Sequence, residues 1–352
     1  MPVRPAAGLQ DLRPQRGPCT ILSVAVPARA VCTRLLTASE LPSWASYLPP
    51  ELASAGSSPP DSPKALGGAD CLGCPRLSPE VMLEDGTTAN LPAALKRVLG
   101  RVWDLAREPE GCREVQLALE AAQSDQARAA IAAELEGHVW EAVRCPHANH
   151  VIQKCVVAMR PVDLQFILDE LMAGSGPPSG ASQAARHRYG CRVVERLMEH
   201  CPPDQVRPLM QSLIADGVAL SRHPYGNYVM QHLLEHGPAD QRRSLIRLLA
   251  QYPQATGSDC YARAVISKAL SHGLREDQVM LTYALIREPG LLASMARTRH
   301  GHVAAKFALQ RLDGRGRAEA RGQLLGELTA IRASRYGRSI AAFLEQHAAC
   351  SS

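Results

Sequence analysis

The pattern of apolar and polar residues repeats at a regular interval from about residue 95 to the C-terminus. In the segment that begins at Asn227, a helix drawn at about 100° per residue separates an apolar face from a polar one. The apolar face consists of Val229, Met230, Leu233 and Leu234. The segment is therefore predicted to be an amphipathic helix with one side in a core.

Seven segments share this template, each anchored on the residue that follows a Gly or an Ala. The anchors are Cys112, Asn149, Cys191, Asn227, Arg263, His302 and Arg338, and they lie 37, 42, 36, 36, 39 and 36 residues apart. A unit of this length holds two or three short helices, which bury a face only by stacking on their neighbours. The expected fold class is all-α, a right-handed α-solenoid of about seven repeats over residues 93–348.

The longest interval between anchors contains a segment rich in Gly and Pro, residues 174–180. Because Gly and Pro disfavour helix, we expect the repeat that follows to have lost or frayed its first helix.

Residues 1–92 differ in composition, with many Pro, Ala, Ser and Gly residues. Such a segment buries too little apolar surface to offset chain entropy, so it is expected to be a disordered arm. Its first forty residues hold five arginines against Asp11 and Glu40, which resembles an organelle transit peptide and leaves that alternative open.

Composition narrows the choices further. The aromatic content of 4% favours helices over a large β-structure, and the net charge of +5 is too small to assign a partner. Eleven cysteines without a secretory signal indicate a reducing compartment. No apolar run is long enough to cross a bilayer.

The polar face carries a repeated set of three residues, which we call the trio. Its first member is Asn or Cys, its middle member is planar or aromatic, and its third member is Gln or Glu one turn after the first. The four trios are Cys112, Arg113 and Gln116; Asn149, His150 and Gln153; Cys191, Arg192 and Glu195; and Asn227, Tyr228 and Gln231. The first and third members can reach one planar ligand edge, and the middle member can stack on it. Solvation alone would favour Lys and Glu at such positions.

At these residues the chain resembles the Pumilio (PUF) family of RNA-binding proteins. The resemblance is closest over residues 189–205 and 223–237 and extends over roughly residues 95–347. It implies a surface that binds single-stranded RNA, antiparallel to the protein, at one base per repeat.

The resemblance also implies base identities. Asn227 with Gln231, and the equivalent pair Asn149 with Gln153, resemble uracil readers, and Cys112 with Gln116 resembles an adenine reader. Glu195, beside Cys191, accepts but cannot donate hydrogen bonds and so suits guanine. The implied core is 5′-U-G-U-A-3′, with Arg113, His150, Arg192 and Tyr228 stacking on the bases.

Toward the C-terminus the trio positions no longer hold the same residue types. The corresponding residues are Arg263, Ala264 and Ser267; His302, Val303 and Lys306; and Arg338, Ser339 and Ala342. Looser contacts are expected there, and the candidate phosphate contacts along the chain are Lys154, Arg196, Arg263, Lys268 and Lys306. A basic stripe follows the third trio position in four repeats and consists of Lys154, Arg196, His232 and Lys268. This basic stripe can be solvated, face RNA or face acidic side chains.

The function implied by the resemblance is binding of messenger RNA 3′ untranslated regions, with recruitment of repression or decay factors. A monomer without cofactor, metal or membrane is expected, and no enzyme motif is present. Two cysteine groupings are rejected as metal sites. Cys71 with Cys74 lacks a second pair of ligands. Cys145, His147 and His150 have a ligand-like spacing, but Pro146 separates them across the entry to a helix and His150 occupies the stacking position. The alternatives are a helical scaffold without RNA binding and a nucleolar relative in ribosomal RNA processing.

Overall fold

The computed structural model describes residues 93–173 and 179–349, all of which lie in the second of the chain's two units, Pro75–Ser352. The described residues form helices joined by turns and contain no strand, which confirms the all-α prediction. The arm expected over residues 1–92 lies outside them. None of the described helices is both long and apolar enough to cross a membrane.

Seven repeats follow one another along the described residues, each with a short helix and an inner helix. The short helices are α3 (Val102–Ala106), α6 (Val139–Ala142), α9 (Gly180–Arg186), α12 (Gly217–Ser221), α15 (Pro253–Gly257), α18 (Leu291–Ala296) and α21 (Leu328–Ala333). The inner helices are α4 (Gly111–Ala121), α7 (Ala148–Ala158), α10 (Gly190–His200), α13 (Gly226–His236), α16 (Ala262–His272), α19 (His302–Arg311) and α22 (Arg338–Ala349). Each predicted anchor is the first or second residue of an inner helix.

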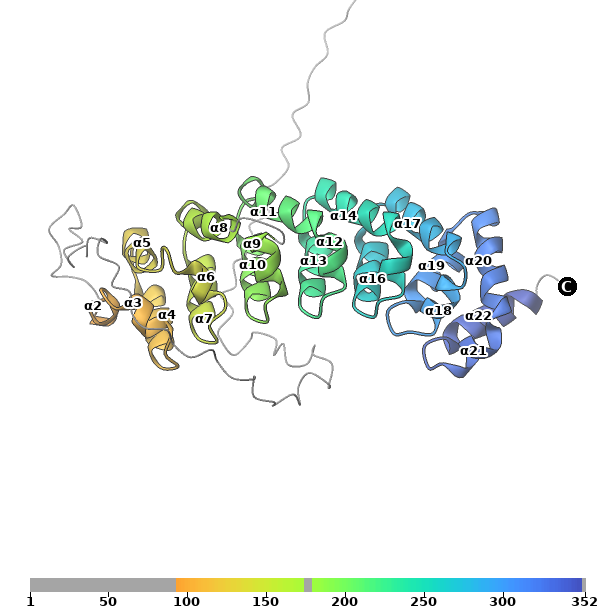
Figure 1. Ribbon diagram of the computed structural model, residues 1–352, viewed down its shortest axis with the longest axis horizontal. Helices are drawn as coiled ribbons and strands as arrows, with labels where there is room; N and C mark the ends of the chain where they lie inside the picture. Colours follow the sequence, from red (N-terminus) through yellow and green to blue (C-terminus); the bar gives the residue numbers. More distant parts are fainter. Residues whose placement is uncertain (1–92, 174–178, 350–352) are drawn as a thin grey trace, which may run out of the picture. The chain divides into compact units, whose positions relative to one another are not determined.

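An outer helix completes each of the first six repeats. The outer helices are α5 (Asp125–Ala133), α8 (Gln165–Met172) with the preceding 3₁₀ turn η3 (Pro161–Leu164), α11 (Pro203–Ala215), α14 (Ala239–Gln251), α17 (Arg275–Arg287) and α20 (Gly314–Gly326). One further helix, α2 (Ala93–Val98), packs on α4 ahead of the first repeat. In Figure 1 the inner helices of the described domain follow one another in a row.

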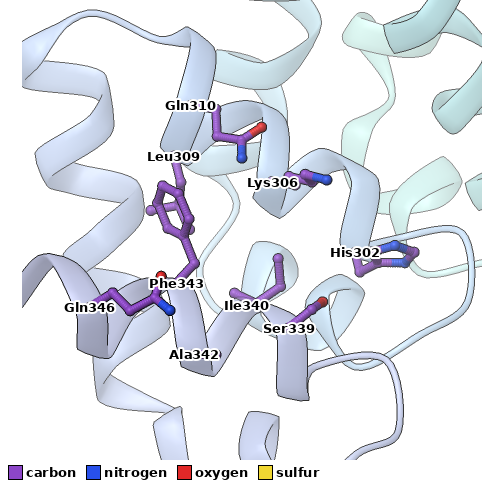
Figure 2. Close-up of a pocket in the computed structure, with 9 residues that line it drawn as sticks. All are labelled: His302, Lys306, Leu309, Gln310, Ser339, Ile340, Ala342, Phe343 and Gln346. Atoms are coloured by element: carbon purple, nitrogen blue, oxygen red, sulfur yellow. The ribbon is translucent and has the colours of Figure 1, made fainter.

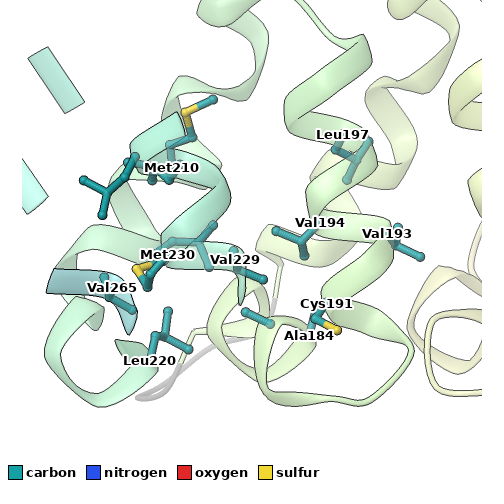
Figure 3. Close-up of a cluster of buried hydrophobic side chains, with 14 of the residues drawn as sticks. Ala184, Cys191, Val193, Val194, Leu197, Met210, Leu220, Val229, Met230 and Val265 are labelled. Carbon is teal, nitrogen blue, oxygen red and sulfur yellow. The ribbon is translucent and has the colours of Figure 1, made fainter. Parts of the chain in front are cut away.

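The core runs without a break from repeat to repeat. The predicted apolar face of α13 is fully buried at Val229, Met230, Leu233 and Leu234. Figure 3 shows this face meeting side chains from neighbouring helices, among them Val194 of α10 and Val265 of α16. Because α13 packs against both α10 and α16, each inner helix buries its stripe only when its neighbours are present.

Glycine at the start of an inner helix allows close approach of the preceding short helix. At Gly226, a Cβ atom would lie 2.8 Å from the carbonyl oxygen of Leu220, and at Gly190 it would lie 2.6 Å from that of Ala184. Two repeats have Ala148 and Ala262 at this position, both fully buried, where the preceding turn leaves room for one methyl group. The Gly or Ala of the sequence template is therefore a packing requirement.

The expectation that one repeat lacks its first helix is wrong. Helix α9 begins at Gly180, where the Oγ of Ser179 accepts a hydrogen bond from the backbone N–H of Ser182. This serine is an N-cap, so the Gly- and Pro-rich composition ends where the helix begins. The buried residues Ala181, Ala184 and Ala185 then supply the apolar face that the sequence reading overlooked.

Carboxylates in or next to two outer helices cap the short helices of the same repeats. Glu170 of α8 accepts hydrogen bonds from the backbone N–H groups of Gly137 and Val139, at 2.6 and 3.0 Å, at the start of α6. Glu134 does the same for Gly100 and Val102, at 2.6 and 2.9 Å, at the start of α3. In both cases the carboxylate belongs to the same repeat as the helix that it caps, and its charge suits the positive end of a helix.

Replacing Glu170 should therefore destabilise the domain without touching the polar face of the inner helices. We expect Glu170→Ala to lower the free energy of unfolding by about 2 kcal/mol, since two charge-assisted hydrogen bonds to backbone N–H groups are lost. Urea denaturation followed by circular dichroism measures this loss. The exposed Glu136 is the control, and Glu136→Ala should change stability by less than about 0.5 kcal/mol. Equal effects of the two substitutions would contradict the assignment.

Candidate nucleic-acid interface

The four trios lie at the same place on four consecutive inner helices, α4, α7, α10 and α13, each of which packs on the next. The first member is the second residue of its helix in every case. These first members are buried, with exposures of 5% for Cys112, 1% for Asn149, 2% for Cys191 and 3% for Asn227. The third members Gln116, Gln153 and Gln231 are half-buried, so they are more accessible to a ligand than the first members.

In the two asparagine repeats, one chain of hydrogen bonds links the turn before the helix to the trio. The Nδ2 of Asn227 donates to the backbone carbonyls of His223 and Pro224, both at 2.8 Å. Its Oδ1 accepts from Nε2 of Gln231 at 2.9 Å. The glutamine amide keeps an acceptor, Oε1, and one N–H donor, which is the pair needed for the N3–H and an adjacent carbonyl oxygen of uracil.

The other asparagine repeat has the same arrangement. The Nδ2 of Asn149 donates to the carbonyl of Cys145 at 2.7 Å, and its Oδ1 accepts from Nε2 of Gln153 at 2.8 Å. Two repeats with the same predicted base therefore share one hydrogen-bond pattern.

The cysteine repeats are built differently. The thiol of Cys112 donates to the carbonyl of Pro109 at 3.3 Å, and Nε2 of Gln116 donates to the backbone carbonyl of Cys112 at 3.1 Å. The side chain of the first member therefore does not fix the glutamine amide. Burial raises the pKa of the Cys191 thiol to about 12, so it remains protonated at neutral pH.

Glu195 is nearly buried and is held by its own trio. Its Oε2 accepts a hydrogen bond from Nη1 of Arg192 at 2.7 Å. Burial raises the pKa of the Glu195 carboxyl, and the adjacent Arg192 guanidinium opposes that shift. The carboxylate is thus a desolvated acceptor with one oxygen engaged.

The middle members of neighbouring trios face each other. The guanidinium carbon of Arg192 lies 5.8 Å from the ring centroid of Tyr228. A base between them needs about 7 Å, two layers of roughly 3.5 Å. The guanidinium must therefore move outward to admit a base, and the move would free both oxygens of Glu195 for the paired N–H donors of guanine.

The basic stripe faces acidic side chains in the preceding repeat. Lys154 pairs with Glu120, and Lys268 pairs with Glu235. His232 follows the same rule, with its Nε2 3.7 Å from a carboxylate oxygen of Glu199. Of the three interpretations left open by the sequence, contact with acidic side chains is the one observed.

The remaining candidate phosphate contacts are less uniform. Arg196 pairs with Glu199 of its own helix at 2.7 Å. Arg263 donates from Nε to the carbonyl of Gly257 at 2.7 Å, and burial lowers its pKa. Lys306 is exposed on α19. Among these five cations, three are thus held by carboxylates in this structure, and phosphate contact by them stays a prediction.

No metal site is present among residues 93–173 and 179–349, where no three His, Cys, Asp or Glu residues gather closely enough to hold an ion. Cys145, His147 and His150 belong to this described part. The pair Cys71 and Cys74 lies outside it.

Sequence reasoning missed the residue four positions before the anchors Cys191, Asn227 and Arg263, which caps the start of the inner helix. The Nδ1 of His223 accepts from the backbone N–H groups of Tyr225 and Gly226 at 3.2 and 3.3 Å. His187 does the same for Tyr189 and Gly190 at 3.3 and 3.4 Å. In the next repeat Asp259 takes this role. Histidine is not among the usual capping residues, and so the pattern was not recognised.

These histidine caps predict a pH dependence of stability. Burial lowers the pKa of His223 from 6.5, and the nearby Arg186 lowers it further. Because the folded-state pKa is the lower one, stability is fully present above pH 6.5 and declines as the pH falls from there through the folded-state pKa. Replacing His223 by Asp, as at Asp259, should keep the cap and reduce this decline. Melting temperatures measured between about pH 7.5 and 5 give the decline in stability. If the melting temperature of the variant falls with pH as steeply as that of the unaltered protein, His223 is not the source of the decline.

Comparison with known proteins agrees with this geometry. The model of the Pumilio-family RNA binding repeat matches residues 144–172, 183–214 and 217–250. The chain thus carries repeats of the Pumilio family over these residues. The matched residues contain the trios anchored at Asn149, Cys191 and Asn227, and the resemblance stated from the sequence is confirmed. This is a family of RNA-binding repeats and not of enzymes, which confirms the expectation about catalysis.

Two yeast proteins show the relationship over short segments. A Pumilio domain-containing protein of Schizosaccharomyces pombe is 24% identical over 139 residues, which is 40% of this chain and 20% of that protein. Pumilio homology domain family member 4 of Saccharomyces cerevisiae is 35% identical over 69 residues, which is 20% of this chain and 7% of that protein. The matched segments therefore span at most a fifth of these relatives.

Solved Pumilio structures share the fold. PUF-8 in complex with PBE-RNA superposes with a TM-score of 0.62 and 25% identity, covering 72% of this chain and 73% of that one. The Puf4 RNA binding domain bound to the HO endonuclease RNA 3′ UTR recognition sequence gives 0.62 and 22%, covering 70% and 77%. Yeast Puf5p bound to MFA2 RNA gives 0.58 and 17%, covering 68% and 66%.

Proposed function

We propose that this Pumilio repeat domain binds single-stranded RNA in a sequence-specific manner through its four trios. The observation that carries the proposal is the register of these trios on α4, α7, α10 and α13, at one place on each helix. Four neighbouring helices thus offer four readers in line, as one base per repeat requires.

The chemistry of each trio supports a U-G-U-A-like core. Gln153 and Gln231, oriented by their asparagines, each offer one acceptor and one donor to uracil. Glu195 offers acceptors only, as guanine requires, and Gln116 suits adenine.

We further propose that the targets are messenger RNA 3′ untranslated regions and that the protein acts in post-transcriptional regulation. Support comes from the fold, which is shared with Puf4 and Puf5p domains whose structures contain target RNAs. In this proposal the domain acts as a monomer in the cytoplasm, and repression or decay factors join the bound RNA.

Selection of bound RNAs from a random pool, followed by sequencing, tests the proposal. Enrichment of a U-G-U core is the expected result. A variant with Gln153, Glu195 and Gln231 all changed to Ala serves as control and should lose the motif while keeping its helical circular dichroism. Binding without any motif would favour a ribosomal RNA role instead, and absence of binding would favour a protein scaffold.

A further inference from the structure

Ion pairs link several outer helices from one repeat to the next. Arg207 of α11 pairs with Asp240 of α14 at 2.7 Å. Arg243 of α14 in turn pairs with Glu276 and Asp277 of α17, at 2.9 and 3.1 Å. In both cases an arginine near the start of one outer helix meets a carboxylate at the start of the next. The charge of these arginines is thus balanced by the repeat that follows.

This series of ion pairs ends at α20, where exposed arginines gather around the turn that joins α19 to α20. Arg275 of α17 donates a hydrogen bond to the backbone carbonyl of Arg311, the last residue of α19. Arg317 donates to the carbonyl of the neighbouring Leu312 at 3.0 Å, and Arg315 is the second residue of α20. We call Arg275, Arg311, Arg315 and Arg317 the arginine patch. None of the four forms an ion pair with a carboxylate of the described residues, where the last repeat has no outer helix to provide one.

The carboxylates near the arginine patch are too few to balance its charge. Asp313 lies in the same turn, where its Oδ1 accepts hydrogen bonds from the hydroxyl of Tyr283 at 2.7 Å and from a backbone N–H of α20 at 2.8 Å. Glu319, further along α20, is exposed. Over residues 275–349 the sequence has twelve Lys and Arg against seven Asp and Glu, whereas residues 93–274 have twenty against nineteen. The net positive charge of the repeats is therefore concentrated at their C-terminal end.

The surface beside the arginine patch suits phosphate groups better than a protein. Gly314 and Gly322 of α20 are exposed, and a Cβ atom at either position would have no neighbour within 4 Å. The flanking exposed apolar side chains, Leu274 and Leu325, are single leucines from different repeats. Protein partners usually need clustered aromatic or apolar anchors, whereas arginine binds phosphate through charge and paired N–H donors. An open, positively charged helix thus favours a polyanion.

We propose that the arginine patch, on the outer face of the array, binds the phosphates of the RNA segment that lies 5′ of the U-G-U-A-like core, whatever the sequence of that segment. The inference rests on the proposed function, in which the strand runs antiparallel to the protein and its 5′ side lies at the C-terminal repeats. Figure 1 shows α20 and α22 at the same, blue end of the row. A strand that leaves the inner helices past α22 therefore meets α20 when it turns around the end of the array.

The inner surface at this end does not repel a strand that leaves over it. A hollow of about 400 Å³ lies between α19 and α22, and no residue that lines it is acidic. Figure 2 shows His302 and Lys306 of α19 on one side of this hollow and Ser339 of α22 on the other. Lys306 is exposed, so the backbone of the strand would pass one cation here before it reaches the arginine patch.

Extension of the RNA on one side tests the proposal. The probes are a U-G-U-A RNA with a few flanking nucleotides, the same RNA with about ten cytidines added at the 5′ end, and the same RNA with the cytidines at the 3′ end. At about 50 mM salt the 5′ extension should raise affinity by about tenfold or more, because about three phosphate contacts release counterions. Most of this gain should be lost by about 200 mM salt. The 3′ extension should have little effect.

Substitutions in the arginine patch locate the contact. The combined variant Arg311→Gln, Arg315→Gln and Arg317→Gln should bind the short RNA as the unaltered protein does but lose the gain from the 5′ extension. The variant with lysine at the same three positions keeps the charges and should keep most of the gain. Circular dichroism and melting temperatures of both variants show whether the repeats remain folded.

A matched control removes the same charge elsewhere on the array. Arg160, Arg207 and Arg247 are arginines in or next to the outer helices of earlier repeats, and their combined change to Gln should leave the gain from the 5′ extension intact. If this control loses the gain as the patch variant does, the effect comes from net charge and not from the arginine patch.

The remaining outcomes separate this proposal from the proposed function. If the U-G-U core is required but the 5′ extension has no effect, or if the gain survives the three glutamines, the arginine patch does not bind the flanking RNA. If the unaltered protein does not prefer the core over a scrambled RNA, the proposed function itself is wrong, and this inference falls with it. A polyglutamate peptide that binds only when the arginine patch is intact, without any effect of the 5′ extension, would assign the patch to an acidic protein partner.

Discussion

Changing Glu195 to Gln is expected to move the base preference at the second core position from guanine toward adenine. Glutamine has nearly the same shape, but it replaces one acceptor with an N–H donor. Adenine presents one acceptor and one donor on its pairing edge, whereas guanine presents adjacent donors. A two-point contact of this kind discriminates bases by about 1–3 kcal/mol, so the ratio of affinities for the two RNAs should change by tenfold or more.

Binding curves with U-G-U-A and U-A-U-A RNAs measure this ratio. Glu199→Gln is the matched control, because Glu199 lies one turn later on α10 and outside the trio. It removes an ion pair with Arg196 and should leave the ratio unchanged. A ratio that does not move in Glu195→Gln, or that moves equally in Glu199→Gln, would show that Glu195 does not read a base.

Changing Tyr228 to Ala is expected to weaken binding by about tenfold or more without altering which bases are preferred. The Tyr228 ring lies next to the Arg192 guanidinium, at the place where a base would be enclosed. Base stacking on an aromatic side chain contributes about 1–3 kcal/mol. Removing the ring removes this term, but the hydrogen-bonding residues of the trios remain.

The conservative variants make this test selective. Tyr228→Phe keeps the ring and should bind almost as tightly as the unaltered protein. Tyr252→Ala removes a tyrosine that is 52% exposed outside the inner helices, and it should have no effect on affinity. Loss of affinity in Tyr228→Phe equal to that in Tyr228→Ala would indicate a role for the hydroxyl group and contradict stacking.

The repeat array could be predicted from sequence because its signals are local. The spacing of apolar residues around Asn227 predicts the helix, its buried face and the polar face, and all seven anchors lie at the start of inner helices. The prediction that one repeat had lost its first helix was wrong for a local reason as well. The Gly- and Pro-rich composition near residue 180 gave no sign of a serine cap or of a buried face made only of small residues.

Other features depend on helices that lie far apart in the sequence, and they leave little trace in a single segment. Glu170 caps a helix more than 30 residues earlier in the chain, and Lys154 meets Glu120 across a similar separation. The burial of Asn149 could not be predicted from the sequence either. A helical projection gives the direction of a side chain but not the depth to which neighbouring turns cover it. Sequence therefore predicts which residues share a face, but not how the turns engage them.

The carboxylates that cap the short helices give each repeat a polarity. Glu134 and Glu170 both reach back toward the N-terminal side, so shortening the domain from its two ends has unequal consequences. Deletion from the N-terminal end leaves a glutamate without the N–H groups that it caps, and water can solvate its carboxylate. A break between Val139 and Glu170 instead leaves the N-terminal fragment with backbone N–H groups that have lost their hydrogen-bond acceptor. Fragments that keep their C-terminal boundary should accordingly be the more soluble and cooperative ones.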